Sequence, residues 1–174
     1  MKILVAYATT DGQTLKIVKF MAERIREAGH EAELFDTDLA RRDVAPDQFD
    51  KVIVAGSVHQ LKHQKCLEVF VFAKRQKLDA VPTLFVSVSL AAAFPDARKQ
   101  ALAYCERFAT ETGWTPDKVV CVAGAVRHED YGYFREQILE HLVLEGAHYD
   151  DLIEDHEFTD WKAVGKAVQE FIGA

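Results

Sequence analysis

Short apolar runs rich in β-branched residues alternate along this chain with longer segments in which apolar residues recur every three or four positions. The short runs are typical of buried strands, and the longer segments are typical of helices with one buried face. Strands are therefore expected at residues 3–7, 31–35, 52–55, 82–88 and 119–123. The second of these alternates between polar and apolar residues, so one of its faces should meet water.

Helices are expected between these strands and after the last one. Gly29 and Gly113 should end two of them, and Thr159 or Asp160 can cap the closing helix. The expected apolar faces are Leu15, Val18, Met21, Ala22 and Ile25; Leu67, Phe70 and Val71; Ala97, Ala101, Tyr104 and Phe108; Phe134, Ile138, Leu139, Leu142 and Val143; and Trp161, Val164, Val168, Phe171 and Ile172.

Five strands that alternate with helices predict a parallel sheet, because parallel neighbours need crossover connections that run over its faces. The predicted fold class is α/β, a doubly wound five-stranded parallel sheet with helices on both faces. The 174 residues contain no repeat and no linker, so residues 1–174 are expected to form a single domain. An acidic segment at about residues 127–158 is interpreted as an insertion before the last helix.

Charge is unevenly distributed along the chain. The net charge is −7, but residues 127–160 contain eleven acidic residues and two arginines, which leaves the rest of the chain near neutrality. Nucleic acid is not expected as a partner, because binding phosphates needs clustered Lys and Arg. No apolar run is long enough to span a bilayer, so stable membrane insertion is not expected.

The cysteines are few and scattered. Cys66, Cys105 and Cys121 are odd in number and form no CxxC pair. This pattern favours reduced thiols in a cytoplasmic protein over a disulfide framework or a zinc site. Four histidines near the acidic residues (His128, His141, His148 and His156) form no compact ligand motif, so no metal is expected.

The loop after the first strand is the clearest candidate for chemistry. It contains Thr9, Thr10 and Thr14 around Gly12, directly before a helix. It lacks the glycines of a dinucleotide-binding GxGxxG turn and the lysine of a P-loop. Hydroxyl groups and free amides at a helix N-terminus can bind a monophosphate. The simpler alternative is a plain helix cap in which Thr10 or Asp11 accepts from the first-turn amides.

With this loop the sequence resembles the flavodoxin family, whose phosphate loop follows the pattern Ser/Thr-x-Ser/Thr-Gly-x-Thr. Asp11 replaces the middle hydroxyl residue here, and the run Asp-Gly-Gln-Thr is similar to the menaquinone-dependent protoporphyrinogen dehydrogenases, a flavodoxin-like branch. The resemblance extends to residues 55–59, 87–90, 123–127 and 158–161. It implies a flavodoxin-like fold with non-covalently bound flavin mononucleotide (FMN).

The resemblance also implies where FMN would lie. The implied phosphate-binding residues are Thr9, Thr10, Gly12, Gln13 and Thr14, and those around the ring are Ser57, Val58 and His59 on one side, Leu90 and Ala91 on the other, and Ala125 and Val126 at its edge. His59 could donate a proton or hydrogen bond during reduction, or be a plain surface histidine. Only Phe94, Tyr131 or Tyr133 could supply an aromatic ring for stacking.

Two functions remain open at this point. The resemblance implies an FMN-dependent protoporphyrinogen IX dehydrogenase, in which the flavin takes hydride from the small-molecule substrate, a porphyrinogen, and passes electrons to a quinone. The alternative is a long-chain flavodoxin, a soluble electron carrier that docks basic redox proteins through its acidic surface. The acidic segment favours the carrier, whereas the loop motif favours the enzyme.

Overall fold

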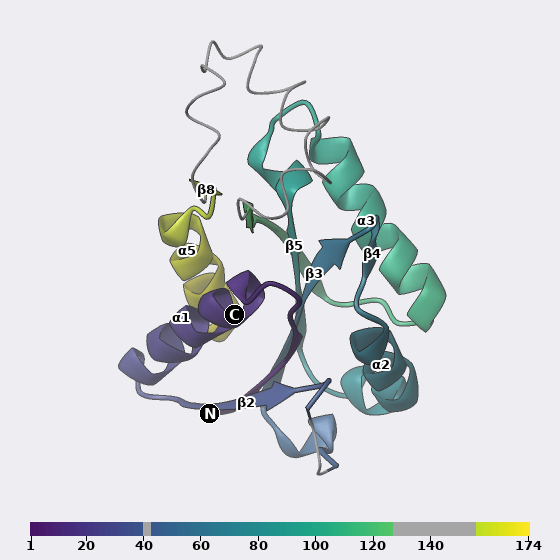
Figure 1. Ribbon diagram of the computed structural model, residues 1–174. Coiled ribbons are helices and arrows are strands. Elements are labelled where there is room, and N and C mark those ends of the chain that lie inside the picture. The colour runs from purple at the N-terminus through teal and green to yellow at the C-terminus, as the bar shows by residue number, and fades with distance from the viewer. Residues whose placement is uncertain (40–42, 127–155) are drawn as a thin grey trace.

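Five parallel strands form the central sheet in the order β2-β1-β3-β5-β6. The computed structural model describes residues 1–39, 43–126 and 156–174 (Figure 1). The strands are β1 (Lys2–Ala8), β2 (Glu31–Asp36), β3 (Lys51–His59), β5 (Thr83–Ser89) and β6 (Lys118–Ala123). Their order places the first strand beside both the second and the third, which is a doubly wound arrangement. The predicted α/β fold class is confirmed.

Helices from the described part of the chain cover both faces of the sheet (Figure 1). Helices α1 (Gln13–Glu27) and α5 (Trp161–Ile172) pack on one face, and α2 (Lys65–Leu78) and α3 (Arg98–Thr112) pack on the other. Two short 3-10 helices, η1 (Pro46–Gln48) and η2 (Leu90–Ala93), lie in the connections. The expected helix around Phe134 to Val143 lies outside the described residues.

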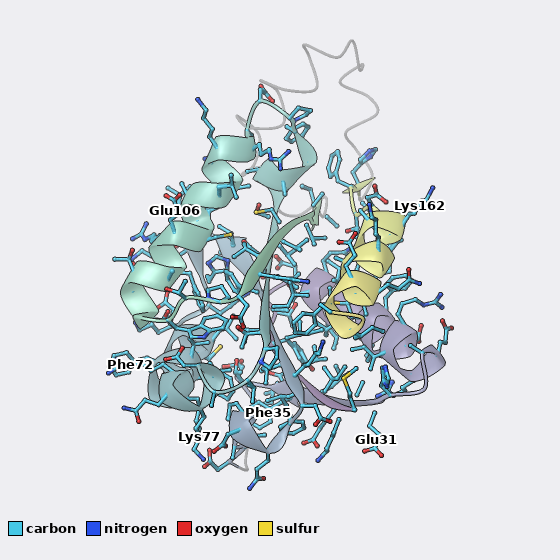
Figure 2. All side chains as sticks on the ribbon, turned by 180° about the vertical axis from the view of Figure 1, so that it is seen from behind. Glu31, Phe35, Phe72, Lys77, Glu106 and Lys162 are labelled. Carbon is cyan, nitrogen blue, oxygen red and sulfur yellow. The ribbon has the colours of Figure 1, made fainter. Side chains whose placement is uncertain are left out.

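Alternate residues of the strands fill two separate cores. In β1, Ile3, Val5 and Tyr7 pack toward α1 and α5. The intervening Leu4, Ala6 and Ala8 belong to the core beneath α2 and α3. Both sets of alternating side chains in β1 are buried, because helices cover both faces of the sheet. This explains the nearly continuous apolar sequence of the strand. Figure 2 shows the side chains of this packing, with Phe72 projecting from α2 away from the sheet.

The third strand is longer than its apolar pattern predicted. The sequence predicted a strand at residues 52–55, whereas β3 continues to His59 and then turns back into the short antiparallel strand β4 (Lys62–His63). Gln60 and Leu61 form the turn with φ angles of 49° and 66°. Positive φ is uncommon at residues other than glycine, and local sequence therefore gave no signal for this hairpin.

The closing helix begins at the predicted position. Asp160 is its N-cap and accepts a hydrogen bond from the Ala163 N–H at 2.9 Å. Thr159, the other candidate, instead donates its hydroxyl hydrogen to the Ala123 carbonyl at 2.7 Å. The cap and the neighbouring hydroxyl thus have separate roles: one begins the helix, and the other ties it to the end of β6.

His63 is buried beneath α3. Its ring lies 5.2 Å from the Phe85 ring and 5.0 Å from the Phe108 ring, between centroids. Its Nε2 is 2.9 Å from the Ser87 hydroxyl oxygen. Burial lowers the pKa of His63 from 6.5 to about 4, because the imidazolium would lose its hydration among aromatic rings. The imidazole is therefore neutral at pH 7.

We expect acid to destabilise the fold through His63. The unfolded chain takes up a proton on this histidine near pH 6.5, whereas the folded chain takes it up only near pH 4. Stability from this group is therefore present above pH 6.5 and falls as pH decreases through that window, by roughly 3 kcal/mol in total. Urea unfolding of the wild type and of His63→Gln at pH 7 and pH 4.5 measures this difference.

The His63→Gln variant should lose less unfolding free energy on acidification than the wild type, whatever its stability at pH 7. The exposed His156 serves as the control, since His156→Gln removes a histidine without removing the buried one. Equal acid losses in the wild type and His63→Gln would show that another group causes the effect.

Candidate functional site

The carboxyl ends of β1, β3, β5 and β6 meet at one edge of the sheet, where a small cavity of about 40 Å³ opens. This edge is where ligands bind in open parallel sheets. The cavity is lined by Thr9, Asp11, Gln13, Thr14, Ser57, Val58, Val88, Ser89, Leu90, Gly124 and Ala125. Its walls therefore come from four loops that are far apart in the sequence.

Helix α1 begins at this cavity without a side-chain cap. Its N-cap residue is Gly12, in the left-handed region with φ 85°, and no side chain caps the helix. The Gly12 N–H donates to the Thr9 hydroxyl oxygen at 3.1 Å. The simpler alternative, a cap formed by Thr10 or Asp11, is wrong. The first-turn amides of α1 and the positive end of its dipole are consequently available to an anion.

Two buried hydroxyl groups in the cavity wall lack hydrogen-bond partners. They are Thr14 Oγ1 and Ser89 Oγ, and neither has a partner within the described part of the chain. Leaving a buried polar group unsatisfied costs about 1–3 kcal/mol. The protein therefore maintains two hydroxyls at an energetic cost, in the position where a bound ligand could satisfy them.

Gln64 connects two of the loops that form the site. Its Nε2 donates to the Thr10 hydroxyl oxygen at 3.1 Å and to the Ser57 hydroxyl oxygen. The loop after β1 is thereby tied to the end of β3. Sequence analysis missed Gln64, because it approaches Ser57 only through the β3–β4 turn at Gln60 and Leu61.

A second set of hydrogen bonds ties the opposite wall together. Gln13 Nε2 donates to the Thr159 hydroxyl oxygen at 2.9 Å, and the Gly124 N–H donates to the Ser89 carbonyl at 3.2 Å. The Phe158 N–H donates to the Gly124 carbonyl at 3.0 Å. The side-chain amide of Gln13 thus holds α1 against the loop before α5. The backbone N–H of Gln13 is the group left for a ligand.

The charges around the cavity are not strongly positive. Lys16, in the first turn of α1, pairs with Glu157, and this contact lowers the pKa of the Glu157 carboxyl. Asp11 lines the cavity and is not used as the helix cap. An anion bound here would therefore depend on amides, hydroxyls and the helix dipole, and it would lie near one opposing carboxylate.

The structure brings many of the predicted site residues to this cavity. Those that line it are Thr9, Gln13, Thr14, Ser57, Val58, Leu90 and Ala125. Gly12 sets the helix start, and Thr10 is held by Gln64 beside the cavity. The residues that line the cavity without having been predicted include Val88, Ser89 and Gly124, which come from the same strand ends.

The remaining predicted residues lie away from the cavity lining. Ala91 and Val126 are buried in an adjoining apolar cluster with Phe94. His59 is half-buried near the end of β3 and does not line the cavity. Phe94 packs against Phe158, with ring centroids 5.7 Å apart, rather than toward the cavity.

Several candidates fall on residues that the structure does not describe. They are Tyr131, Tyr133, His128, His141 and His148, together with most of the acidic segment. Among residues 1–39, 43–126 and 156–174, no group of three or more His, Cys, Asp or Glu side chains is placed to hold a metal ion. Within those same ranges, no helix combines the length and apolarity needed to cross a membrane.

Comparisons with family models and with known proteins point to the same family. A model of the flavodoxin domain matches residues 4–152. Protoporphyrinogen IX dehydrogenase (quinone) of Escherichia coli K12 is 27% identical over 173 residues, which cover 98% of this chain and 94% of that protein. The enzyme of the same name from Leishmania major is 26% identical over 172 residues, covering 98% of this chain and 74% of that protein.

Solved structures show the same fold at lower identity. A short-chain flavodoxin associated with a bacterial microcompartment superposes with a TM-score of 0.60 at 12% identity, covering 99% of this chain and 97% of that one. An NADH:FMN oxidoreductase in its apo form superposes with a TM-score of 0.56 at 13% identity, covering 98% and 88%. At these identities the likeness concerns the fold alone.

Gly56 is expected to be essential for the β3 wall of the cavity. A Cβ at this position would lie 2.5 Å from Leu67 Cδ2 and 3.2 Å from Gln64 Oε1. Because Leu67 is fully buried, Gly56→Ala should lower the free energy of unfolding by about 1–3 kcal/mol. Urea unfolding measures this change.

Gly165, inside α5, offers the matched control. A Cβ there would meet only ordinary contacts with Phe20 at 3.7 Å. Gly165→Ala should therefore stabilise the protein by up to about 1 kcal/mol through helix propensity. A Gly56→Ala variant as stable as the wild type would contradict the close approach of α2 to β3.

Proposed function

Because the chain belongs to the flavodoxin family, we propose that it binds FMN at the strand-end cavity and uses it as an oxidoreductase. The phosphate would occupy the cavity at the start of α1. A site of about 40 Å³ suits one such group rather than a whole cofactor. The ribityl chain and ring would then extend over the neighbouring loops.

The residues at this cavity fit a phosphate monoester. Thr14 supplies a buried hydroxyl, and Gly12 begins α1; among the described residues the hydroxyl has no partner and no side chain caps the helix. Amides at a helix N-terminus and hydroxyl donors together can compensate a phosphate without a lysine or arginine. The proposed phosphate-binding residues are Thr9, Thr10, Gly12, Gln13 and Thr14.

The loops beside the phosphate position would hold the ring. Ser89 offers its unpaired hydroxyl from the end of β5, and the ring would lie among Ser57, Val58, His59, Leu90, Ala91, Ala125 and Val126. No aromatic side chain of the described residues lines the cavity. A ring that is not stacked between aromatics keeps an accessible face for a small substrate. His59 is our candidate for holding a proton near that face.

We propose protoporphyrinogen IX as the substrate and a quinone as the electron acceptor. Bound FMN would supply the two-electron chemistry between them, and the protein would supply binding and orientation. The observation that supports this assignment is the similarity, over 98% of this chain, to two enzymes of that name at 27% and 26% identity.

A soluble electron carrier is the second candidate, favoured by the charge distribution. Eleven acidic residues against two arginines in residues 127–160 would attract basic redox proteins and repel the carboxylates of a porphyrinogen. Of these acids, Glu157 is partly neutralised by Lys16. The two functions differ in the electron donor and acceptor and share the FMN site.

Replacing Thr14 by valine should weaken FMN binding while leaving the FMN-free protein as stable or more stable. Valine has the same shape but lacks the hydroxyl that is buried without a partner. The lost hydrogen bond to phosphate should cost roughly 1.5–3 kcal/mol, or about 10- to 150-fold in affinity. Flavin fluorescence titration and urea unfolding of the FMN-free protein measure the two effects.

Thr112 provides the matched control for this experiment. It is also fully buried, but its hydroxyl donates to the Phe108 carbonyl at 2.7 Å, and it does not line the cavity. Thr112→Val should lower stability and leave FMN affinity unchanged. Unchanged FMN affinity in Thr14→Val would contradict the assignment of the phosphate to this cavity.

The FMN-loaded protein is expected to oxidise protoporphyrinogen IX anaerobically when a menaquinone analogue is supplied, and the FMN-stripped protein should not. Thr14→Val should lose this activity at limiting FMN and recover it in excess FMN. The readout is the appearance of protoporphyrin fluorescence. An FMN-loaded protein that fails in this assay, but transfers electrons to a basic redox protein at a rate that falls with added salt, would establish the carrier function instead.

A further inference from the structure

Cys105 and Cys121 lie in contact although they are 16 residues apart in the sequence. Cys105 projects from α3 and Cys121 from β6, and their sulfur atoms are 3.7 Å apart. A disulfide requires the sulfurs to approach to about 2.05 Å, so these two thiols, already in contact, would have to move closer together. The scattered positions of the cysteines in the sequence predicted reduced thiols and gave no sign of this contact.

The pair lies beside a second cavity, and Cys121 forms part of its wall. This cavity of about 560 Å³ lies between η2, the start of α3 and β6, and Cys121 and Arg98 are among its lining residues. It shares no lining residue with the strand-end cavity. Cys121 is half-buried, whereas Cys105 behind it is buried.

The contact also favours loss of one proton from the pair. Cys121 and the Ser87 hydroxyl can each hydrogen-bond to Cys105, and these contacts lower the pKa of the Cys105 thiol despite its burial. The same contact and burial raise the pKa of Cys121, because a second negative charge beside the first is unfavourable. One thiolate beside one thiol is the protonation state that precedes disulfide formation.

We propose that Cys105 and Cys121 are a modification site, at which hydrogen peroxide converts the two thiols into a reversible intrachain disulfide. The thiolate of the pair attacks one oxygen of the peroxide and the O–O bond breaks, which gives a sulfenic acid and hydroxide. The hydroxide takes up the proton that the thiol had released and leaves as the first water. The second thiol attacks the sulfenic sulfur, the S–S bond forms and a second water leaves. Two thiols lose two electrons and two protons, and one peroxide is reduced to two waters.

The oxidation would link helix α3 to the edge strand β6. Helix α3 follows η2, whose Leu90 lines the strand-end cavity. The disulfide would therefore restrain the element that follows the proposed ring-binding loop. The chemistry itself is independent of FMN and of the proposed function, and it can be tested even if the substrate assignment fails.

The oxidation is carried out on the folded 174-residue protein with FMN bound. The reduced protein is treated with hydrogen peroxide, unfolded in urea, alkylated there with iodoacetamide, digested without reductant and analysed by mass spectrometry. We expect one intrachain peptide pair joined through Cys105 and Cys121, a mass loss of about 2 Da before alkylation, and reversal by dithiothreitol. Cys66, on α2, should still be a free thiol after oxidation and should therefore be alkylated by iodoacetamide.

Cysteine-to-serine variants identify which two sulfur atoms form the disulfide. Cys66→Ser should form the same disulfide to the same extent, whereas Cys105→Ser and Cys121→Ser should form none within the chain. If either of the latter variants fails to fold, the peptide pair of the wild type still decides. A disulfide that includes Cys66, an interchain dimer, or sulfinic acid on Cys121 with Cys105 still alkylated would overturn the proposal.

Discussion

Burial of the central strands on both faces is the constraint on which the rest of the structure depends. Every residue of β5 and every residue of β1 after Lys2 is buried. Such strands can exist only with helices on both sides, so each connection must cross the sheet and return to the same edge. The loops after β1, β3, β5 and β6 meet for this reason, and the candidate site is their meeting point.

At that edge the fold leaves polar groups that it does not satisfy itself. Helix α1 begins at Gly12 without a side-chain cap, and the hydroxyls of Thr14 and Ser89 are buried without partners in the described chain. These features lower stability and provide donors for an anion. Asp11 opposes an anion at the same place, so affinity depends on how many neutral donors act together against one negative charge.

The two faces of the sheet differ in their chemistry. Beneath α1 and α5 the core is apolar, with Ile3, Val5 and Ile53 at its centre. Beneath α2 and α3, Ser87 contacts His63 and influences Cys105, which contacts Cys121. Acid sensitivity and thiol chemistry are therefore both expected on this face, apart from the cavity at the strand ends.

Much of the fold and part of the site followed from the sequence. The five parallel strands were predicted close to their observed places, except that β3 continues beyond its predicted end to His59. Burial on both faces gives β1, β3 and β5 apolar runs that are visible in each strand alone. The candidate phosphate-binding loop, residues 9–14, could be found because its residues are consecutive and stand directly before a helix. The N-cap at Asp160 was one of two local choices, since capping involves only residues close in sequence.

Tertiary structure alone decided which distant side chains meet. The approach of Gln64 to Thr10 and Ser57 depends on a hairpin whose turn residues, Gln60 and Leu61, are not glycines. The contact of Cys105 with Cys121 depends on how α3 packs against β6. Periodicity and capping involve only a few neighbouring residues, so they can be recognised in the local sequence. The contacts of Gln64 and of the two cysteines exist only once helices and strands have packed together.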